Sequence, residues 1–567
     1  MNTSASSDAP LSSKADRAGS GRAARWIAAA ALAALALAVR LPNLRAAYPY
    51  INYVDEGHIL HRVTLMLRER TWDPGWYYYP PLPSYTVAAA AVLVSPLYAL
   101  SVGHSLADDL SPSPPFTYDR IEPGALVLVG RSVCLALSLL IVLQCALLAR
   151  RLGGETAAWI AAAASALLPA LAVRGTLVSV DGFVTVFVLL ALDLADRARR
   201  APGPGRLVWL AGAAAGLAAS SKYPAGLVGL GVVASLAAAT WTWRARLRAM
   251  VTAALAAIVA LLVTMPPLTL RTTQVVAHLR TESQLYASQR VGLYWEQILR
   301  RAEWDLPYSG PEIGWVFLFL TAAGLAVALA TRRHRVAVAP WLVYAAFTIA
   351  LLAMHPGFRA FRNLLPLSAL ATVLVGLLGD WLASRVGHVR AVTALGTLML
   401  AALFLWPLLR HGRERARFAD SRAEAVDWLA SRGANQPVLV MHELAVLPSE
   451  LARLGRKMRQ VGWTSPLLAE IAAANPRWLL LGDLQKADGP VISAETWSAV
   501  EARFERVATF GETLASVDGG TWKGNRQQLS IWRRKRPRVR PEAAQPGRLP
   551  GFSATPPAAH SGQAASE

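Results

Sequence analysis

The sequence predicts an all-α polytopic membrane protein of about eleven transmembrane helices, followed by a small α/β domain on the outer side. Hydrophobic residues make up 54% of the 567 residues and charged residues only 16%, a balance too apolar for a soluble protein. The apolar residues form runs near the ~20 residues that a helix needs to cross a bilayer. Helices are expected because lipid offers backbone groups no other partner.

The amino-terminal segment, residues 1–25, is rich in Ser, Ala, Asp and Gly and lacks an apolar run, so we expect a disordered cytoplasmic tail. The apolar run that starts at Trp26 follows Arg22 and Arg25 and could be a signal peptide. However, Arg40 and a Pro-Asn pair follow it without a clear small-residue cleavage site. We therefore interpret the run as an uncleaved first helix that leaves the amino terminus in the cytoplasm.

Basic residues in the short loops give the orientation of the later helices. Ten further spans are expected at 125–149, 157–173, 182–195, 207–221, 225–243, 249–268, 313–331, 336–354, 364–383 and 392–409. One side of these spans collects Arg150, Arg151, Arg197, Arg199, Arg200, Arg206, Arg244, Arg246, Arg248, Arg332, Arg333, Arg335, Arg385 and Arg390. That side is predicted to be cytoplasmic, in a bacterial inner membrane, with a transmembrane domain over residues 26–409.

The moderately apolar stretch 85–102 is predicted to lie at the membrane interface or to be re-entrant. A full crossing there would place Arg150 and Arg151 outside and invert every later loop, against the charge rule. The first outer loop then runs over residues 48–124 and carries more acids than bases.

After the last span the composition becomes polar and predicts a small extracytoplasmic α/β domain over residues 410–532. Asp420 is a candidate cap for a helix that Gly433 would stop. The runs PVLVMHEL, RWLLLGD and QQLSIW are typical of strands, and residues 494–506 of a helix. Residues 533–567 are basic and then rich in Pro, Ala, Ser and Gly, and are predicted to be disordered.

The net charge of +21 could suggest nucleic acid, but the arginines lie in short clusters between apolar runs, so we expect no nucleic-acid partner. Membrane lipid is the expected surrounding. Cys134 and Cys145 lie in one apolar run and offer no disulfide framework or metal motif. They are expected to be small buried residues.

Ionisable and aromatic residues concentrate at the predicted outer face. They are Asp55, Glu56, His58, His61, the run WYYYPPLPSY, Arg131, Arg174, Asp181, Lys222, Tyr223 and the run HPGFRAFRN. A transporter should instead place polar residues and broken helices near the midplane, in two related halves. We find no internal repeat, and the charged residues Arg40 and Asp193 within apolar runs lie near helix ends.

These residues resemble, in order, the motifs of the lipid-linked-sugar glycosyltransferase superfamily (GT-C), which includes the protein O-mannosyltransferases and the lipid A aminoarabinose transferases. The matching elements are Tyr53-Val54-Asp55-Glu56, Pro80 to Leu82, Arg131, Pro169, Arg174, Asp181, Lys222 and Arg362. The resemblance runs from about Arg40 to Pro366. It implies transfer of a sugar from a polyprenyl-phosphate donor to a glycan, lipid or protein acceptor outside the cytoplasm.

The sequence departs from the family in three places. Tyr79 stands before Pro-Pro-Leu where the aminoarabinose transferases carry a lysine. Asn363 and Ala369 stand where the family usually has a tyrosine and a second proline. The large luminal domain of the eukaryotic mannosyltransferases has no counterpart. The resemblance therefore does not identify the sugar or the acceptor of this protein.

Displacement of phosphate from an anomeric carbon requires a base for the acceptor hydroxyl and cations for the leaving phosphate. Asp55 is the candidate base, with helix capping as the alternative, and Glu56 is expected to orient it or to bind acceptor. Candidate donor-phosphate ligands are Lys222, Arg359, Arg362 and Arg131. Each arginine has an alternative role as a membrane anchor that reaches the lipid headgroups.

Asp181 is expected to pair with Arg174 or to help hold a cation, and Tyr79, Tyr223 and His58 to line the substrate. Trp72 and residues 76–79 fit an interfacial aromatic belt better than a sugar platform. His58, His61 and His355 could join Asp55 around a divalent metal ion, but their spacing is no ligand motif, so no cofactor is assigned. The alternative function is transport of a polyprenyl-linked lipid or an ion, and a third is a structural or assembly protein.

Overall fold

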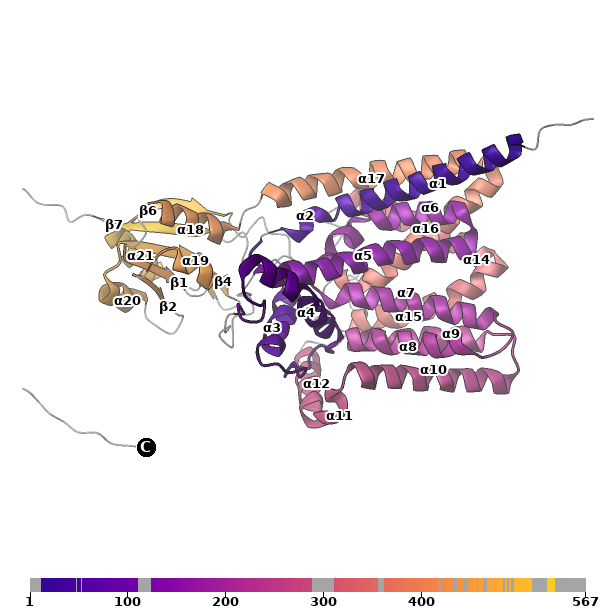
Figure 1. Cartoon of the computed structure of the whole chain (residues 1–567), viewed down its shortest axis with the longest axis horizontal. Helices are drawn as coiled ribbons and strands as arrows, with labels where there is room; N and C mark the ends of the chain where they lie inside the picture. Colours follow the sequence, from indigo (N-terminus) through magenta and orange to yellow (C-terminus); the bar gives the residue numbers. More distant parts are fainter. Residues whose placement is uncertain are drawn as a thin grey trace, which may run out of the picture.

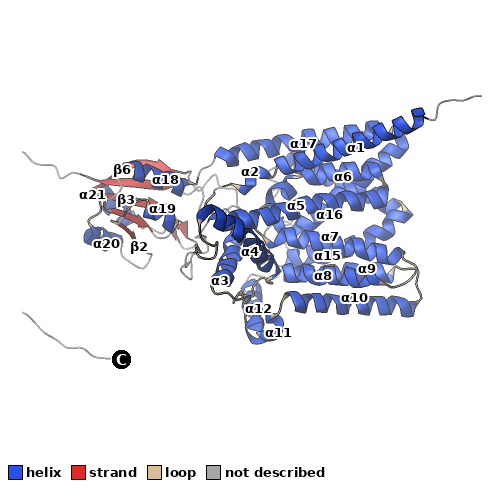
Figure 2. Cartoon of the chain, viewed as in Figure 1, coloured by secondary structure: helices blue, strands red, loops and turns tan. Residues whose placement is uncertain are grey.

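The computed structural model describes residues 12–46, 48–51, 54–110, 124–287, 311–354, 361–417, 420–432, 436–441, 446–455, 457–461, 467–482, 485–486, 489–490, 494–511 and 528–535. These residues form a helical bundle with a mixed α/β domain beyond one end of it, and the strands are confined to that domain (Figures 1 and 2). The predicted carboxyl-terminal tail lies largely outside the described residues, but the segment 1–25, predicted to be disordered, is helical from Ser12, where α1 begins.

Each predicted span coincides with a helix. The helices are α1 (Ser12–Ala38), α5 (Gly124–Gly153), α6 (Glu155–Leu167), α7 (Val180–Arg200), α8 (Arg206–Ser221), α9 (Val228–Ala237), α10 (Trp243–Thr264), α14 (Pro311–Ala330), α15 (Arg332–Met354), α16 (Leu365–Val386) and α17 (Val389–Arg417). They run roughly along one direction in Figure 1. The chain is a multi-pass membrane protein.

Length and apolar composition qualify seven helical segments of the described chain to cross a membrane. They are Arg25–Leu44, Leu82–Val102, Gly124–Gly153, Trp243–Thr264, Arg332–Ala353, Leu365–Val386 and Val389–Leu409. Helices α6, α7 and α8 are absent from this set, although each lies within the bundle. The predicted number of eleven crossings therefore stays a prediction.

Helix α4 (Leu82–Val102) is long and apolar enough to span, contrary to what its moderate hydropathy led us to expect. It lies with α3 (Val54–Arg68) at the end of the bundle nearest the α/β domain, out of line with the long helices (Figure 1). This placement suits the predicted interfacial position, which remains untested.

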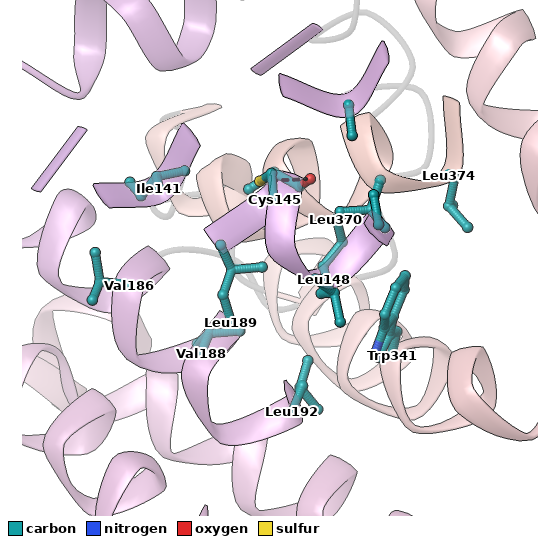
Figure 3. Close-up of a cluster of buried hydrophobic side chains, with 14 of the residues drawn as sticks. Ile141, Cys145, Leu148, Val186, Val188, Leu189, Leu192, Trp341, Leu370 and Leu374 are labelled. Carbon is teal, nitrogen blue, oxygen red and sulfur yellow. Dashed lines mark hydrogen bonds between the residues drawn. The ribbon is translucent and has the colours of Figure 1, made fainter. Parts of the chain in front are cut away.

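The bundle core is built from small side chains and close backbone contacts. Helix α6 is buried along nearly its whole length. Residues of α5, α7, α15 and α16 meet in the cluster of Figure 3, where the Cys145 thiol donates to the carbonyl of Ala369 at 3.5 Å. A Cβ on Gly212 of α8 would lie 2.1 Å from the carbonyl oxygen of Ala253 in α10, so these helices touch through their backbones. Both cysteines are free and buried, as predicted.

Arg40 stabilises a break in the bundle. Helix α6 ends before Pro169, which lacks an N–H and therefore leaves the carbonyl of Ser165 without its helical donor. The π-helical turn η1 (Ala170–Arg174) follows. The buried guanidinium of Arg40 donates to the carbonyls of Ser165 (3.2 Å) and Ala166 (2.7 Å). A cation at a helix carboxyl end is electrostatically favourable, so this buried charge serves the fold.

Short elements surround the predicted outer end. They are α2 (Leu41–Leu44), η2 (Tyr223–Leu227), α11 (Pro267–Leu270), α12 (Thr272–Ala287) and η3 (Phe361–Leu364). Figure 1 shows α2, α3, α4, α11 and α12 together at the end of the bundle that faces the α/β domain.

The α/β domain contains a five-stranded sheet in the order β2-β1-β3-β7-β6. Strands β1 (Val438–Met441), β3 (Trp478–Gly482) and β7 (Leu529–Arg534) coincide with the three predicted runs, while β2 (Met458–Val461) was not predicted. β1 pairs in parallel with β2 and β3, and β7 is antiparallel to β3 and β6. A second, two-stranded sheet joins β4 (Gln485–Lys486) to β5 (Gly489–Pro490).

Its helices are α18 (Ser421–Ser431), α19 (Pro448–Ala452), α20 (Leu467–Ala474) and α21 (Ala494–Arg503). Asp420 caps α18 as predicted, accepting from the backbone N–H of Arg422. The proposed stop at Gly433 lies outside the described residues. The helix predicted over 494–506 ends at Arg503, because β6 (Phe504–Phe510) begins there with a buried phenylalanine and pairs with β7. Tertiary pairing overrides the local helical pattern at this junction.

Candidate active site

A buried ion pair fixes the start of α3. The guanidinium of Arg131 on α5 donates through Nε and Nη2 to the two carboxylate oxygens of Glu56, at 2.9 Å each. Both side chains are fully buried. Glu56 also accepts from the backbone N–H of Val178 at 3.2 Å. This bidentate geometry is strong and specific, so it holds α3, α5 and the segment before α7 in one arrangement.

The same guanidinium closes the loop that leads to α3. Arg131 Nη1 donates to the carbonyls of Leu44 (3.0 Å) and Ala46 (2.8 Å), just after α2. Arg131 thus binds residues on both sides of the segment 47–55. Arg131 is buried and makes four hydrogen bonds to three residues, so these contacts account for its charge without the predicted donor phosphate. Both carboxylate oxygens of Glu56 accept from Arg131 and one also accepts from the Val178 N–H, so these contacts account for Glu56 without an acceptor.

Asp55 occupies the first turn of α3, next to Glu56, and is 2% exposed. Its position follows from the ion pair, because Glu56 and Arg131 anchor the helix one residue later. Helix α3 lies at the end of the bundle nearest the α/β domain, which is the end that the sequence predicts to be outside (Figure 1).

A second group of charges lies at the amino end of α7. Ser179 caps this helix, which places Asp181 in its first turn. Lys222, which follows α8, has its Nζ 3.0 Å from Asp181 Oδ1 and also donates to the Asn363 side-chain oxygen. We expected Asp181 to pair with Arg174 or to help hold a cation, and the structure shows an ion pair between Asp181 and Lys222. Arg174 ends η1 and is 9% exposed.

A pocket opens at this charged group. Its charged and amide lining is Asp181, Lys222 and Asn363. The rest comes mainly from η2 and α15, with the aliphatic side chains of Leu227, Leu351 and Leu352 and the hydroxyl-bearing Tyr344 and Thr348. Asn363 belongs to η3, directly before α16. The site therefore combines a cation, its carboxylate and amide partners, and a hydrocarbon-like wall.

Aromatic side chains of the loop after α3 pack against histidines. Trp76 stacks on His58 with ring centroids 5.2 Å apart, and Tyr79 meets Trp76 edge-on at 5.7 Å. Tyr78 stacks on His278 of α12 at 4.8 Å. Tyr223 donates its hydroxyl to the carbonyl of Tyr77 at 2.8 Å, which links this loop to η2 beside the pocket. Of the predicted lining residues, His58 and Tyr79 therefore share Trp76 as a neighbour, while Tyr223 contacts the backbone of Tyr77.

Three predicted residues cannot be placed by their side chains. Arg359 and His355 lie outside the described residues, and Arg362 is described only as part of η3. Within the described residues no group of three or more His, Cys, Asp or Glu side chains could hold a metal ion. Burial and the nearby Arg62 lower the pKa of His61 to about 4, so this imidazole is neutral near pH 7.

The sequence reasoning missed two features of the site. Asn363 was noted only as a departure, although it contacts Lys222 in the structure. The Glu56–Arg131 pair joins residues far apart in the chain, and no local signal connects them.

Comparison with known proteins supports the predicted fold. Residues 124–269 match the model of a family described as dolichyl-phosphate-mannose-protein mannosyltransferase. The matched region includes Arg131, Arg174, Asp181 and Lys222. No curated protein sequence matches the chain.

Two solved structures of one protein share most of the fold. ArnT from Cupriavidus metallidurans bound to undecaprenyl phosphate is 16% identical, with a TM-score of 0.53 over 89% of this chain and 98% of ArnT. Its apo state is 15% identical, with a TM-score of 0.51 over 90% and 98% of the two chains. The chain therefore has an ArnT-like fold, which confirms the predicted helical membrane domain with a small carboxyl-terminal α/β domain.

Proposed function

We propose that the chain is an inverting glycosyltransferase that moves a sugar from a polyprenyl-phosphate carrier to an acceptor hydroxyl outside the cytoplasm. The acceptor would be a cell-envelope glycan, a lipid or a protein, and the enzyme would face the periplasm from a bacterial inner membrane. The fold shared with ArnT, whose structure holds undecaprenyl phosphate, supports a polyprenyl-linked donor.

The observation that carries this proposal is the pocket at Lys222. A lysine ammonium at its polar end suits phosphate oxygens, and the apolar residues along its wall suit a hydrocarbon chain. Polyprenyl phosphate joins these two kinds of group, because its phosphate is attached directly to a hydrocarbon chain. Asp181 and Asn363 would hold the ammonium in place until the phosphate takes over part of its coordination.

Asp55 is the proposed base. In a single displacement it accepts the proton of the acceptor hydroxyl, the oxygen attacks the anomeric carbon, and the bond from that carbon to the phosphate oxygen breaks. The configuration at the anomeric carbon is inverted, and polyprenyl phosphate leaves with the electrons of the broken bond. Glu56 and Arg131 act as positioning residues, because their buried fork fixes the first turn of α3.

Other predicted residues keep proposed roles in this scheme. Arg359 and Arg362 would add positive charge around the donor phosphate. Arg174 and Asp181 would support the second outer loop. Tyr79, Tyr223 and His58 would line the substrate, a role supported by the contacts of His58 and Tyr79 with Trp76 and by the hydrogen bond from Tyr223 to the Tyr77 carbonyl.

The test is donor cleavage by the purified full-length protein in detergent or nanodiscs. Carrier lipids labelled in the sugar should release polyprenyl phosphate, and adding extracts of envelope glycan or lipid should increase the release. The Asp55→Asn variant serves as the control without a base. A transporter would instead move the intact carrier lipid between leaflets without breaking the bond to the sugar, and that result would reject the proposal.

A further inference from the structure

The α/β domain contacts the loop that precedes the proposed base. The guanidinium carbon of Arg422, in the first turn of α18, lies 3.9 Å from the ring centroid of Tyr50. Tyr50 belongs to the segment between α2 and α3 and precedes Asp55 by five residues. The contact therefore joins the carboxyl-terminal domain to the outer loop of the membrane bundle, in agreement with the placement of α18 and α2 in Figure 1.

Burial makes this contact specific. Tyr50 is 0% exposed, Arg422 1% and Asp420 2%. Asp420 accepts from the Nε and Nη2 of Arg422 at 2.8 Å each and also caps α18. The bidentate contact with Asp420 thus fixes the orientation of the Arg422 guanidinium, which lies over the ring of Tyr50. A desolvated cation over an aromatic ring is among the stronger contacts of its kind.

The segment between α2 and α3 is held by contacts at its beginning, at Tyr50 and at its end. Arg131 binds the carbonyls of Leu44 and Ala46 at its beginning and the Glu56 carboxylate at its end. Tyr50 lies between these anchors, under Arg422. The membrane bundle alone fixes both ends of the loop, and the α/β domain fixes its middle.

We infer that the α/β domain is a positioning element for the transfer reaction, and that Tyr50 and Arg422 form its contact with the loop that precedes Asp55. This inference rests on the proposed function. Arg422, Asp420 and Tyr50 touch no reacting atom in the scheme above. They act by restricting the loop, so that the carboxylate of Asp55 stays where the acceptor hydroxyl must lose its proton. Small displacements of a catalytic group reduce turnover severely.

The decisive variants change one side of the contact at a time. Tyr50→Leu removes the ring from the loop and leaves the α/β domain unaltered. Arg422→Met removes the cation from the domain. Tyr50→Phe keeps the ring face and should restore the contact. The matched control is Arg432→Met, because Arg432 lies 4.3 Å over Trp428 within the same domain and makes the same type of contact away from the loop.

Two measurements are needed on the full chain. Steady-state kinetics should show kcat lowered about 10- to 100-fold in Tyr50→Leu and Arg422→Met, with KM for the carrier sugar within about twofold of the parent. Tyr50→Phe and Arg432→Met should retain most of the turnover. Hydrogen exchange should show faster exchange over residues 48–56 in the two impaired variants, with strands β1 and β3 unchanged, which demonstrates that the domain itself is folded.

The outcomes separate the possible failures. Parent-like kcat in Tyr50→Leu, or faster loop exchange without loss of turnover, would overturn the inference. If Arg422→Met loses turnover and also shows rapid exchange in β1 and β3, the substitution has unfolded the α/β domain. The kcat of Tyr50→Leu then decides whether the inference stands. If the parent protein releases no polyprenyl phosphate, the proposed function fails, while the exchange data still report whether Arg422 restrains the loop.

Discussion

Replacing Glu56 with Gln should destabilise the protein far more than it alters the chemistry. The Glu56 carboxylate accepts two hydrogen bonds of 2.9 Å from Arg131 and one of 3.2 Å from Val178. Glutamine keeps the shape, but it offers one oxygen and turns an N–H₂ group toward a second donor. The cation of Arg131 stays in a site with no exposure to water. Leaving one partner of a buried pair uncompensated costs about 3 to 5 kcal/mol.

That magnitude corresponds to a shift of about 10²- to 10⁴-fold in the folding equilibrium. Denaturant unfolding of purified protein, followed by circular dichroism, measures it directly. A double variant, Glu56→Gln with Arg131→Gln, removes both charges and should lose at least about 2 kcal/mol less than the sum of the two single variants. A Glu56→Gln protein with parent stability and lost turnover would refute this reasoning and return Glu56 to a direct chemical role.

Four further outcomes are expected. Asp55→Asn should lower turnover by about 10²- to 10⁴-fold at unchanged stability and donor affinity, and near-parent turnover would place the base elsewhere. Lys222→Met should weaken binding of polyprenyl phosphate by about 10- to 100-fold in a lipid-binding assay, as expected for a lost charged hydrogen bond. Gly212→Ala should destabilise the bundle by about 1 to 3 kcal/mol in thermal unfolding, whereas Gly229→Ala, in open space, should not. Because the folded-state pKa of His61 is depressed to about 4, stability should be constant above its unfolded pKa and fall as the pH drops from about 6.5 toward 4, and His61→Gln should flatten that slope in acid titrations.

Local patterns predicted the elements of this protein well. Each apolar run became a helix, and the runs around Leu439, Leu480 and Ile531 became neighbouring strands of one sheet. The helix cap at Asp420 was also predicted. In these cases the signal and the structure depend on residues within one or two turns of each other, so the sequence contains the whole cause.

A criterion of length and hydropathy alone leaves out some helices of the bundle, although their apolar runs predicted a span at each. Helices α6, α7 and α8 are shorter or more charged than an isolated span requires, yet they lie inside the bundle and are sheltered by their neighbours. Hydropathy measures transfer from water to lipid, and it cannot report how much of a helix faces protein.

In the candidate site, too, some features follow from the sequence alone and others from the tertiary structure. The sequence by itself determined that acids and bases gather at the ends of the bundle, because charge is excluded from the spans and must collect in the loops. Only the tertiary structure decided their partners: Arg131 with Glu56, Lys222 with Asp181 and Asn363, and Arg422 with Tyr50. These pairings join residues that are far apart in the chain, and a buried charge takes whichever partner the packing of the helices brings within reach.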